Sequence, residues 1–274
     1  MPESLVVPGA VLHYQVRGTG PVLLIAQSGE GDADRSTDLV AQLTDAYTVV
    51  TYDRRGLSRS RLADPGRGVT LAEHTDDAHR VLAAVTDAPA LMLGCSLGAV
   101  IGLRLARLHP EQLSTLIAHE PIAPGLLAEG TRIRHRQELA DLRARYLRDG
   151  LAATVPEIAR TLGIDPTHAD AEPDLTPQPM TERRLGNFDH FLRHDFPAVL
   201  ADDFDYTDLA TSGLRIVPAA GRSTPATVFD RQCAVALAEL VGHPVVEFPG
   251  GHNGNTSHPK AYAERLREAL ATSP

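Results

Sequence analysis

Six short apolar runs recur along the chain, each rich in valine, isoleucine or leucine and without regular polar alternation. They span residues 22–28, 47–53, 90–96, 114–120, 214–220 and 244–250. Strands that are covered on both faces have this composition, so the runs predict a parallel sheet with helices on either side. The stretch VVPGAVLHYQV near the N-terminus predicts an antiparallel hairpin at one edge of that sheet.

Segments with the apolar spacing of helices separate these runs. They span residues 37–46, 71–87, 97–110, 229–242 and 259–270. The last begins at Pro259, and proline is favoured in the first turn of a helix. A succession of strand, helix and strand predicts an open, doubly wound α/β sheet that is mostly parallel.

Residues 124–208 break this alternation, because they contain no run that reads as a strand. Helical spacing covers 131–150, where Leu139, Leu142 and Tyr146 share one stripe, and it resumes over 181–204. A proline- and aspartate-rich stretch at 164–180 reads as a loop between them. We therefore predict a helical cap at 124–208, inserted into a sheet domain formed by residues 1–123 and 209–274.

The first cap helix carries a run of arginines, which could form an anion-binding patch. They are Arg132, Arg134, Arg136, Arg143 and Arg145. Charge runs on helices usually face solvent, and i,i+4 spacing offers the pairs Arg134–Glu138 and Asp141–Arg145. We favour this solvated interpretation.

Composition narrows the class of protein further. The 274 residues carry a net charge of −9, which argues against a nucleic-acid partner. The sequence contains neither an apolar run long enough to span a membrane nor a recognisable secretory signal, so we predict a cytoplasmic protein. The oligomeric state, monomer or homodimer, is left open. The two cysteines, Cys95 and Cys233, lie in apolar surroundings and are predicted to be buried thiols.

A serine stands between two glycines at the end of an apolar run, in Gly94-Cys95-Ser96-Leu97-Gly98. A strand that turns sharply into a helix strains its turn residue, and only small neighbours fit two positions away. The run before Ser96 and the helical segment after it supply that context. Ser96 is therefore a candidate nucleophile, although an ordinary strand-to-helix turn could have the same residues.

At this point the chain resembles the α/β-hydrolase fold family over nearly its whole length. Besides the serine turn, YDRRGLSRS (52–60), FPGGHNG (248–254) and the position of the cap match the family. The resemblance implies that Ser96 attacks a carbonyl carbon and that His252 accepts its proton. The remaining candidate histidines are interpreted as structural: His79, His119, His190, His194 and His258.

The resemblance also implies an oxyanion hole, the set of N–H groups that binds the developing negative charge. One donor is the backbone N–H of Leu97, and the second comes from the loop after residues 22–26, at either Ser28 or Gly29. Gln27 could add a side-chain donor in the substrate pocket, or it could secure the loop.

The third member of the triad is the carboxylate that orients the histidine. In most of the family it follows the strand after the cap, but Thr224 stands there. The family's other position is the end of the strand before the cap, which is Glu120. We predict that Glu120 is the triad acid, since it lies 24 residues after Ser96, room for one helix and one strand. Glu120 could instead merely close its strand, and Asp230 is predicted to lie within a helix.

Two classes of function remain open from the sequence. The first is a serine hydrolase for an ester, thioester or lactone of a small, largely apolar molecule, with Phe188, Phe191 and Phe196 lining the pocket. The second is a non-hydrolytic protein of the same fold, either a small-molecule receptor or a cyclase or lyase. No metal, nicotinamide, flavin or phosphate motif is evident, so neither a metal nor a cofactor is expected.

Overall fold

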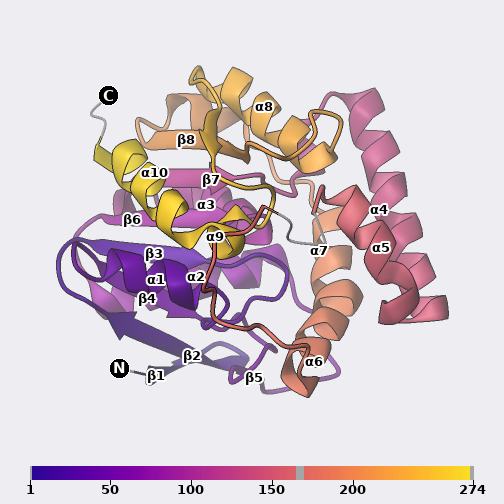
Figure 1. Cartoon of the computed structure of the whole chain (residues 1–274), viewed down its shortest axis with the longest axis horizontal. Helices are drawn as coiled ribbons and strands as arrows, with labels where there is room; N and C mark the ends of the chain where they lie inside the picture. The colour runs from indigo at the N-terminus through magenta and orange to yellow at the C-terminus, as the bar shows by residue number, and fades with distance from the viewer. Residues whose placement is uncertain (1, 165–169, 272–274) are drawn as a thin grey trace.

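A single mixed sheet runs through the computed structural model, which describes residues 2–164 and 170–271 (Figure 1). The strand order is β1-β2-β4-β3-β6-β7-β8-β9, with β5 paired to β2 outside this path. Strands β1 and β2 form the predicted antiparallel hairpin, and β2 is also antiparallel to β4. From β4 to β9 every pairing is parallel, which confirms the predicted doubly wound architecture.

Each predicted strand is present within a few residues of its expected bounds. The strands are β1 Pro2–Val7, β2 Ala10–Arg17, β3 Val22–Ala26, β4 Thr48–Tyr52, β5 Arg61–Leu62, β6 Ala90–Cys95, β7 Leu113–His119, β8 Arg215–Gly221 and β9 Val246–Phe248. Successive side chains of a strand enter opposite faces, so β6 sends Leu93 into one core cluster and Met92 into the other.

Helices cover both faces of the sheet. Apolar residues of α1 Thr37–Leu43 and α10 Pro259–Ala271 fill one core cluster, and those of α2 Leu71–Val85, α3 Leu97–Leu108 and α8 Phe229–Val241 fill the other. A single turn of helix, α9 Gly254–Ser257, precedes α10. Cys95 and Cys233 are buried free thiols, as predicted. In the described part of the chain, no helix is long and apolar enough to cross a membrane.

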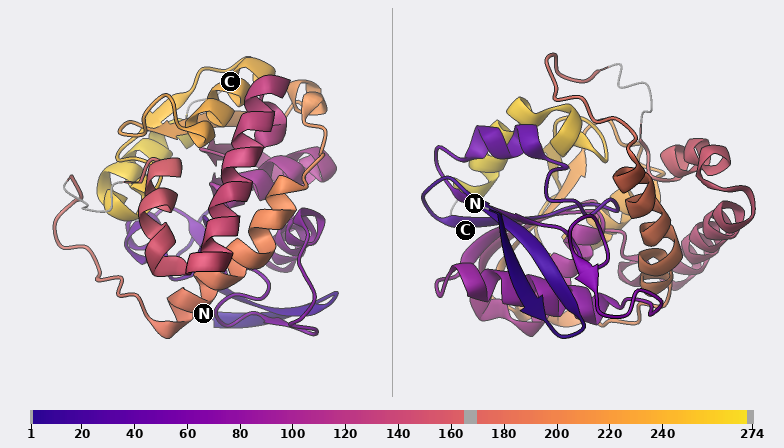
Figure 2. Two further views of the ribbon diagram at one scale, coloured as in Figure 1. Left: turned by 90° about the vertical axis from the view of Figure 1, so that its right-hand side faces the viewer. Right: turned by 90° about the horizontal axis from the view of Figure 1, so that it is seen from below.

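The remaining helices gather at one end of the sheet, where the chain leaves β7 (Figures 1 and 2). They are α4 Glu129–Asp149, α5 Leu151–Thr161, α6 Glu182–His190 and α7 Phe196–Leu200, with a π-helical segment at Phe191–Asp195. Short 3-10 turns occur at Pro110–Gln112, Pro124–Leu126 and Thr207–Thr211. Part of the predicted loop at 164–180, residues 165–169, lies outside the described residues.

The arginine-rich helix α4 buries its predicted apolar stripe but not with the predicted charge pairs. Leu139, Leu142 and Tyr146 are all buried. Arg145 instead contacts Glu157 of α5, its Nη1 2.7 Å from Oε2, and Glu138 contacts His135. The predicted pairs Arg134–Glu138 and Asp141–Arg145 are therefore wrong: Arg145 pairs with a carboxylate of α5, and Glu138 pairs with His135 of its own helix.

Candidate active site

Ser96 occupies a strained turn between β6 and α3. Its φ is +56° and its ψ is −113°, a conformation that costs energy for a residue with a Cβ. A Cβ on Gly94 would lie 2.5 Å from the carbonyl oxygen of Gly98, and one on Gly98 would overlap the carbonyl of Ala26. The two glycines therefore let α3 approach β6 and β3 closely enough to form the turn.

Parallel strand register brings the candidate acid to the same edge of the sheet. Cys95 pairs with His119 across β6 and β7, so Ser96 and Glu120 are both the first residues beyond paired strand ends. Glu120 has a φ of +45°, which is also unfavourable for a side-chain-bearing residue. Its backbone N–H donates to the carbonyl of Ala219, 2.9 Å away, and this bond fixes the turn that directs the carboxylate inward.

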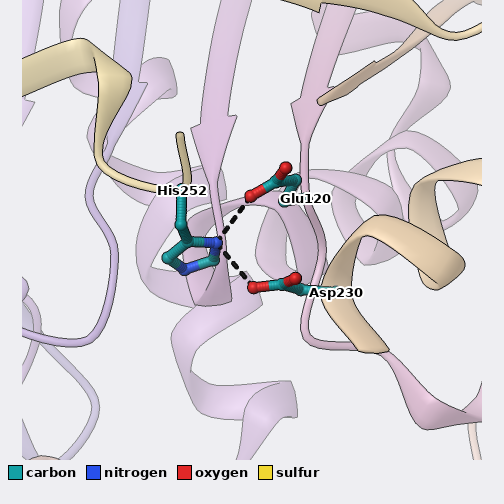
Figure 3. Close-up of side chains that lie close together, drawn as sticks. All are labelled: Glu120, Asp230 and His252. Carbon is teal, nitrogen blue, oxygen red and sulfur yellow. Dashed lines mark hydrogen bonds and ion pairs between the residues drawn. The ribbon is translucent and has the colours of Figure 1, made fainter. Parts of the chain in front are cut away.

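His252 lies on the loop after β9, which passes very close to the end of β8. A Cβ on Gly221 would lie 2.4 Å from the carbonyl carbon of Gly251, so a side chain there would push the loop away. In the observed position the His252 ring is 2 % exposed, and its Nδ1 is 2.8 Å from Glu120 Oε2 (Figure 3). The structure thus brings His252 and Glu120 into hydrogen-bond contact.

A second carboxylate reaches the same ring nitrogen. Asp230, in the first turn of α8, has its Oδ2 2.7 Å from His252 Nδ1 (Figure 3). Sequence reasoning placed Asp230 in a helix, which is correct, but missed that the helix begins beside the histidine. Thr224, six residues earlier, is also buried but offers no charge.

Burial and mutual contact shift the ionisation of these three groups. Burial acts to raise the pKa of Glu120, but its bond to His252 and nearby positive charge hold the pKa below its usual value. Burial raises the pKa of Asp230, with the Glu120 charge adding to the effect. Burial acts to lower the pKa of His252, yet the two carboxylates outweigh it and raise that pKa. The imidazolium form is therefore strongly stabilised here.

Ser96 and His252 both open into a cavity of about 70 Å³ that is also lined by residues of α5, α6 and the π-helical segment. One wall is the loop after β3, with Ser28, Gly29 and Glu30. The other walls are mostly apolar side chains from the cap: Ile158, Leu162, Ile164, Phe188, Phe191 and Leu192. An apolar enclosure excludes water and strengthens the electrostatic interactions of the polar groups inside it.

Two of the predicted pocket residues line this cavity and two do not. Phe188 and Phe191 line it. Phe196 is buried against Phe191, with ring centroids 5.2 Å apart, and Gln27 accepts a hydrogen bond from Ser36 Oγ at 2.8 Å. Phe196 and Gln27 are not among the residues that line this cavity, and the contact of Gln27 with Ser36 ties it to the loop after β3. The cavity is also lined by Ile158 of α5, a helix that the sequence pattern does not predict because Pro156 stands inside it.

Arg54, on the loop after β4, organises the predicted oxyanion loop from behind. Its guanidinium donates to the carbonyls of Gln27, Ser28 and Gly29, at 3.0, 2.5 and 2.7 Å. In a trans peptide the N–H points opposite to the carbonyl, so this fan of bonds turns the following N–H groups away from Arg54. No pattern in the sequence predicts this contact, since Arg54 is one of several arginines in YDRRGLSRS.

Asp195 of the π-helical segment balances the charge of Arg54. Its Oδ2 lies 2.9 Å from Arg54 Nη2, and its Oδ1 lies 3.0 Å from Nε2 of His74 on α2. All three side chains are at most 1 % exposed. Burial acts to raise the pKa of Asp195, but the charge of Arg54 and the hydrogen bond to His74 hold it far below its usual value. A buried ion pair therefore joins the π-helical segment to Arg54, which in turn binds the loop after β3.

The histidines interpreted as structural have other surroundings. His119 is buried against Phe248 and Tyr262, and burial lowers its pKa to about 4. His79 bonds Gln112, while His190 and His194 lie against each other in the cap. Among the described residues, the side chains grouped closely enough to hold a metal ion are Glu120, Asp230 and His252, whose ligand atoms lie within 4.8 Å of one another.

Comparison with known proteins agrees with this architecture. Residues 21–204 match the model of a family described as alpha/beta hydrolase fold. The chain is 40% identical over 271 residues to the "Uncharacterized hydrolase YraK" of Bacillus subtilis (strain 168), covering 97% of this chain and 95% of that protein. Its fold is similar to that of an esterase from Exiguobacterium antarcticum, with 16% identity, a TM-score of 0.76 and coverage of 99% and 100%. A hydrolase from Pseudomonas aeruginosa PA01 gives 23% identity and a TM-score of 0.73, with coverage of 99% and 98%. The chain therefore belongs to the α/β-hydrolase fold family and is related to hydrolases.

Proposed function

We propose that this protein is a serine hydrolase that cleaves an ester, thioester or lactone of a small, largely apolar molecule. One observation carries the proposal: a serine in a strained turn and a histidine held by a buried carboxylate open into the same apolar cavity. A serine hydroxyl needs a base to accept its proton, and the base needs an acid to fix its tautomer. The non-hydrolytic alternative would gain support from a histidine without an acidic partner, whereas His252 has two.

The proposed reaction has two halves. Ser96 Oγ attacks the carbonyl carbon while its proton passes to His252 Nε2, and Glu120 accepts a hydrogen bond from Nδ1–H throughout. The N–H of Leu97, at the N-terminus of α3, and an N–H of the loop at Ser28 or Gly29 bind the oxyanion. His252 then gives its proton to the leaving oxygen or sulfur, and water attacks the acyl-serine with His252 again as base.

The cavity supports a small apolar acyl group. Its volume of about 70 Å³ is far below the 300–1,000 Å³ of pockets that enclose larger ligands. Ile158, Leu162 and Phe188 offer no hydrogen bonds from their side chains to a polar acyl chain. Hydrophobic contact is then the main attraction for the acyl part, and the ester carbonyl alone needs polar partners.

A panel of p-nitrophenyl esters of increasing chain length, with lactones and thioesters beside them, tests the proposal. We expect release of p-nitrophenol to be fastest with short acyl chains. A fluorophosphonate that reacts with activated serines should label the protein, and Ser96→Ala should abolish labelling. Tight binding of a small molecule with neither turnover nor labelling would instead favour the receptor.

Substitutions of three phenylalanines should separate pocket lining from packing. Phe188→Ala and Phe191→Ala should change the ratio of kcat/KM between short and long acyl chains, because both side chains line the cavity. Phe196→Ala should leave that ratio unchanged and lower the free energy of unfolding by about 3–5 kcal/mol, the usual cost of removing a core phenylalanine. Ester kinetics and urea unfolding measure the two effects. An unchanged ratio in both lining variants would remove these side chains from substrate selection.

A further inference from the structure

The two carboxylates at His252 compete for one hydrogen. The Nδ1 atom lies 2.8 Å from Glu120 Oε2 and 2.7 Å from Asp230 Oδ2, yet it carries a single hydrogen. Glu120 accepts it with good hydrogen-bond geometry. Asp230 Oδ2 is fully buried and, among the described residues, has no hydrogen-bond donor aligned with it. A buried carboxylate oxygen at contact distance without a hydrogen bond requires an explanation, because burial without a bond is costly.

Each carboxylate is held independently of the other. Glu120 Oε1 accepts a hydrogen bond from the backbone N–H of Gly221, at 2.8 Å. Asp230 Oδ1 accepts one from the N–H of Arg231, also at 2.8 Å, in the first turn of α8, where the helix dipole favours negative charge. Glu120 directly follows β7 and Asp230 lies on α8, so the removal of one carboxylate leaves the other anchored beside the ring.

The other titratable groups near the His252 ring do not take the place of the two carboxylates, Glu120 and Asp230. His119, the residue before Glu120, is buried with its pKa lowered to about 4 and is neutral near neutral pH. Burial raises the pKa values of Cys95 and Tyr262, so both are uncharged as well. Arg231 directs its guanidinium to the carbonyl of Gly221 and to Glu247, which lies outside the cluster. Glu120 and Asp230 are thus the anions that face the His252 ring.

We propose that Asp230 is a second positioning residue for His252, able to hold Nδ1–H in place of Glu120. This inference rests on the proposed function, because it assigns a partner to the base of that reaction. A rotation of the imidazole ring, which carries the N–H with it, transfers the hydrogen bond from one carboxylate to the other. With either acid present, the ring keeps the tautomer that exposes Nε2 as a base toward Ser96.

Three variants test the inference on a short-chain p-nitrophenyl ester: Glu120→Gln, Asp230→Asn and the double variant. Each single change should lower kcat by on the order of 10–100-fold, because one acid remains. The double change should lower kcat by about 10⁴, the loss that follows when a triad histidine has no acid. Glu239→Gln, which changes an exposed carboxylate on the same helix α8, is the matched control and should alter nothing. A loss of about 10⁴ in either single variant would overturn the inference, since one acid would then act alone.

The titration of His252, followed by NMR with labelled histidine, gives a readout apart from activity. Loss of either anion should lower the pKa of His252, and the rise of kcat/KM with pH should move to lower pH by the same amount. A structural role for Asp230 would leave both unchanged, and that result would also overturn the inference. If Asp230→Asn does not fold, Asp230→Ser removes the charge with a smaller side chain and should give the same shift.

Failure of the proposed function is distinguishable from failure of this inference. A parent protein that hydrolyses none of the esters, or a Ser96→Ala variant that is as active as the parent, would reject the hydrolase. The acid variants are compared only as ratios to an active parent. The NMR titration reports whether both carboxylates act on His252 in either case.

Discussion

Ser96→Ala is expected to lower kcat for ester hydrolysis by on the order of 10⁶ while the fold stays intact. Without the hydroxyl no acyl-enzyme forms, and only direct attack of water on the ester remains. The oxyanion donors and the apolar cavity can accelerate only that slower reaction. Alanine fits the same turn, because the strain at a φ of +56° comes from the backbone and Cβ that both residues share. Steady-state hydrolysis of a short p-nitrophenyl ester measures the loss, and thermal unfolding checks the fold.

Ser223→Ala is the matched control for that change. Ser223 is an exposed serine that follows β8, and its backbone N–H bonds the carbonyl of Gly250 just before the His252 loop. Its hydroxyl has no part in the proposed reaction, so kcat should stay at the parent value. Turnover by Ser96→Ala within tenfold of the parent would remove Ser96 from the mechanism.

His252→Gln is expected to lower kcat by a similar factor of about 10⁶, because an amide cannot accept the serine proton. The double variant Ser96→Ala/His252→Gln should be no slower than either single variant, since nucleophile and base act as a unit. Stopped assays over long incubations, with active-site titration of the parent, measure rates this low.

His258→Gln controls for the loss of a histidine from the same loop region. His258 is six residues further on, and its ring bonds Ser257. This variant should hydrolyse the ester at the parent rate. If His252→Gln kept more than a hundredth of the parent activity, a different base would have to be sought, and His119 beside Glu120 would be the first to examine.

Prediction from the sequence was most accurate where a local pattern sufficed. The apolar runs are strands in the structure. Because neighbouring strands of the sheet are parallel, the ends of β6 and β7 lie at the same edge of the sheet. The resemblance to the family put a candidate acid at the end of the strand before the cap, and that position falls on Glu120, beside the end of β6. Its hydrogen bond to His252 is now observed, while its role as the triad acid stays a prediction for the variants above.

The errors arose where orientation in space decides the outcome. Asp230 was placed in a helix, but which face of α8 meets His252 depends on how Phe229, Cys233 and Leu237 pack in the core. Helix α5 was missed because Pro156 stands inside it, and a proline inside a helical pattern usually marks the end of a helix. The charge pairs on α4 were chosen by spacing alone, although contacts with another helix can outweigh an i,i+4 pair of a few tenths of a kcal/mol.

The buried pair of Arg54 and Asp195 also constrains how this protein can change over evolution. Insertion of a cap from a relative, or rearrangement of this one, would have to retain a carboxylate at the place of Asp195. Loss of one partner of a buried pair usually costs about 3–5 kcal/mol, a large part of the stability of a typical domain. Loss of Arg54 itself would also release the carbonyls of Gln27 to Gly29 from a fixed orientation. Replacement of the helical segment that carries Asp195 is therefore expected to cost stability, whereas substitutions in the walls of the cavity leave the pair with Arg54 intact.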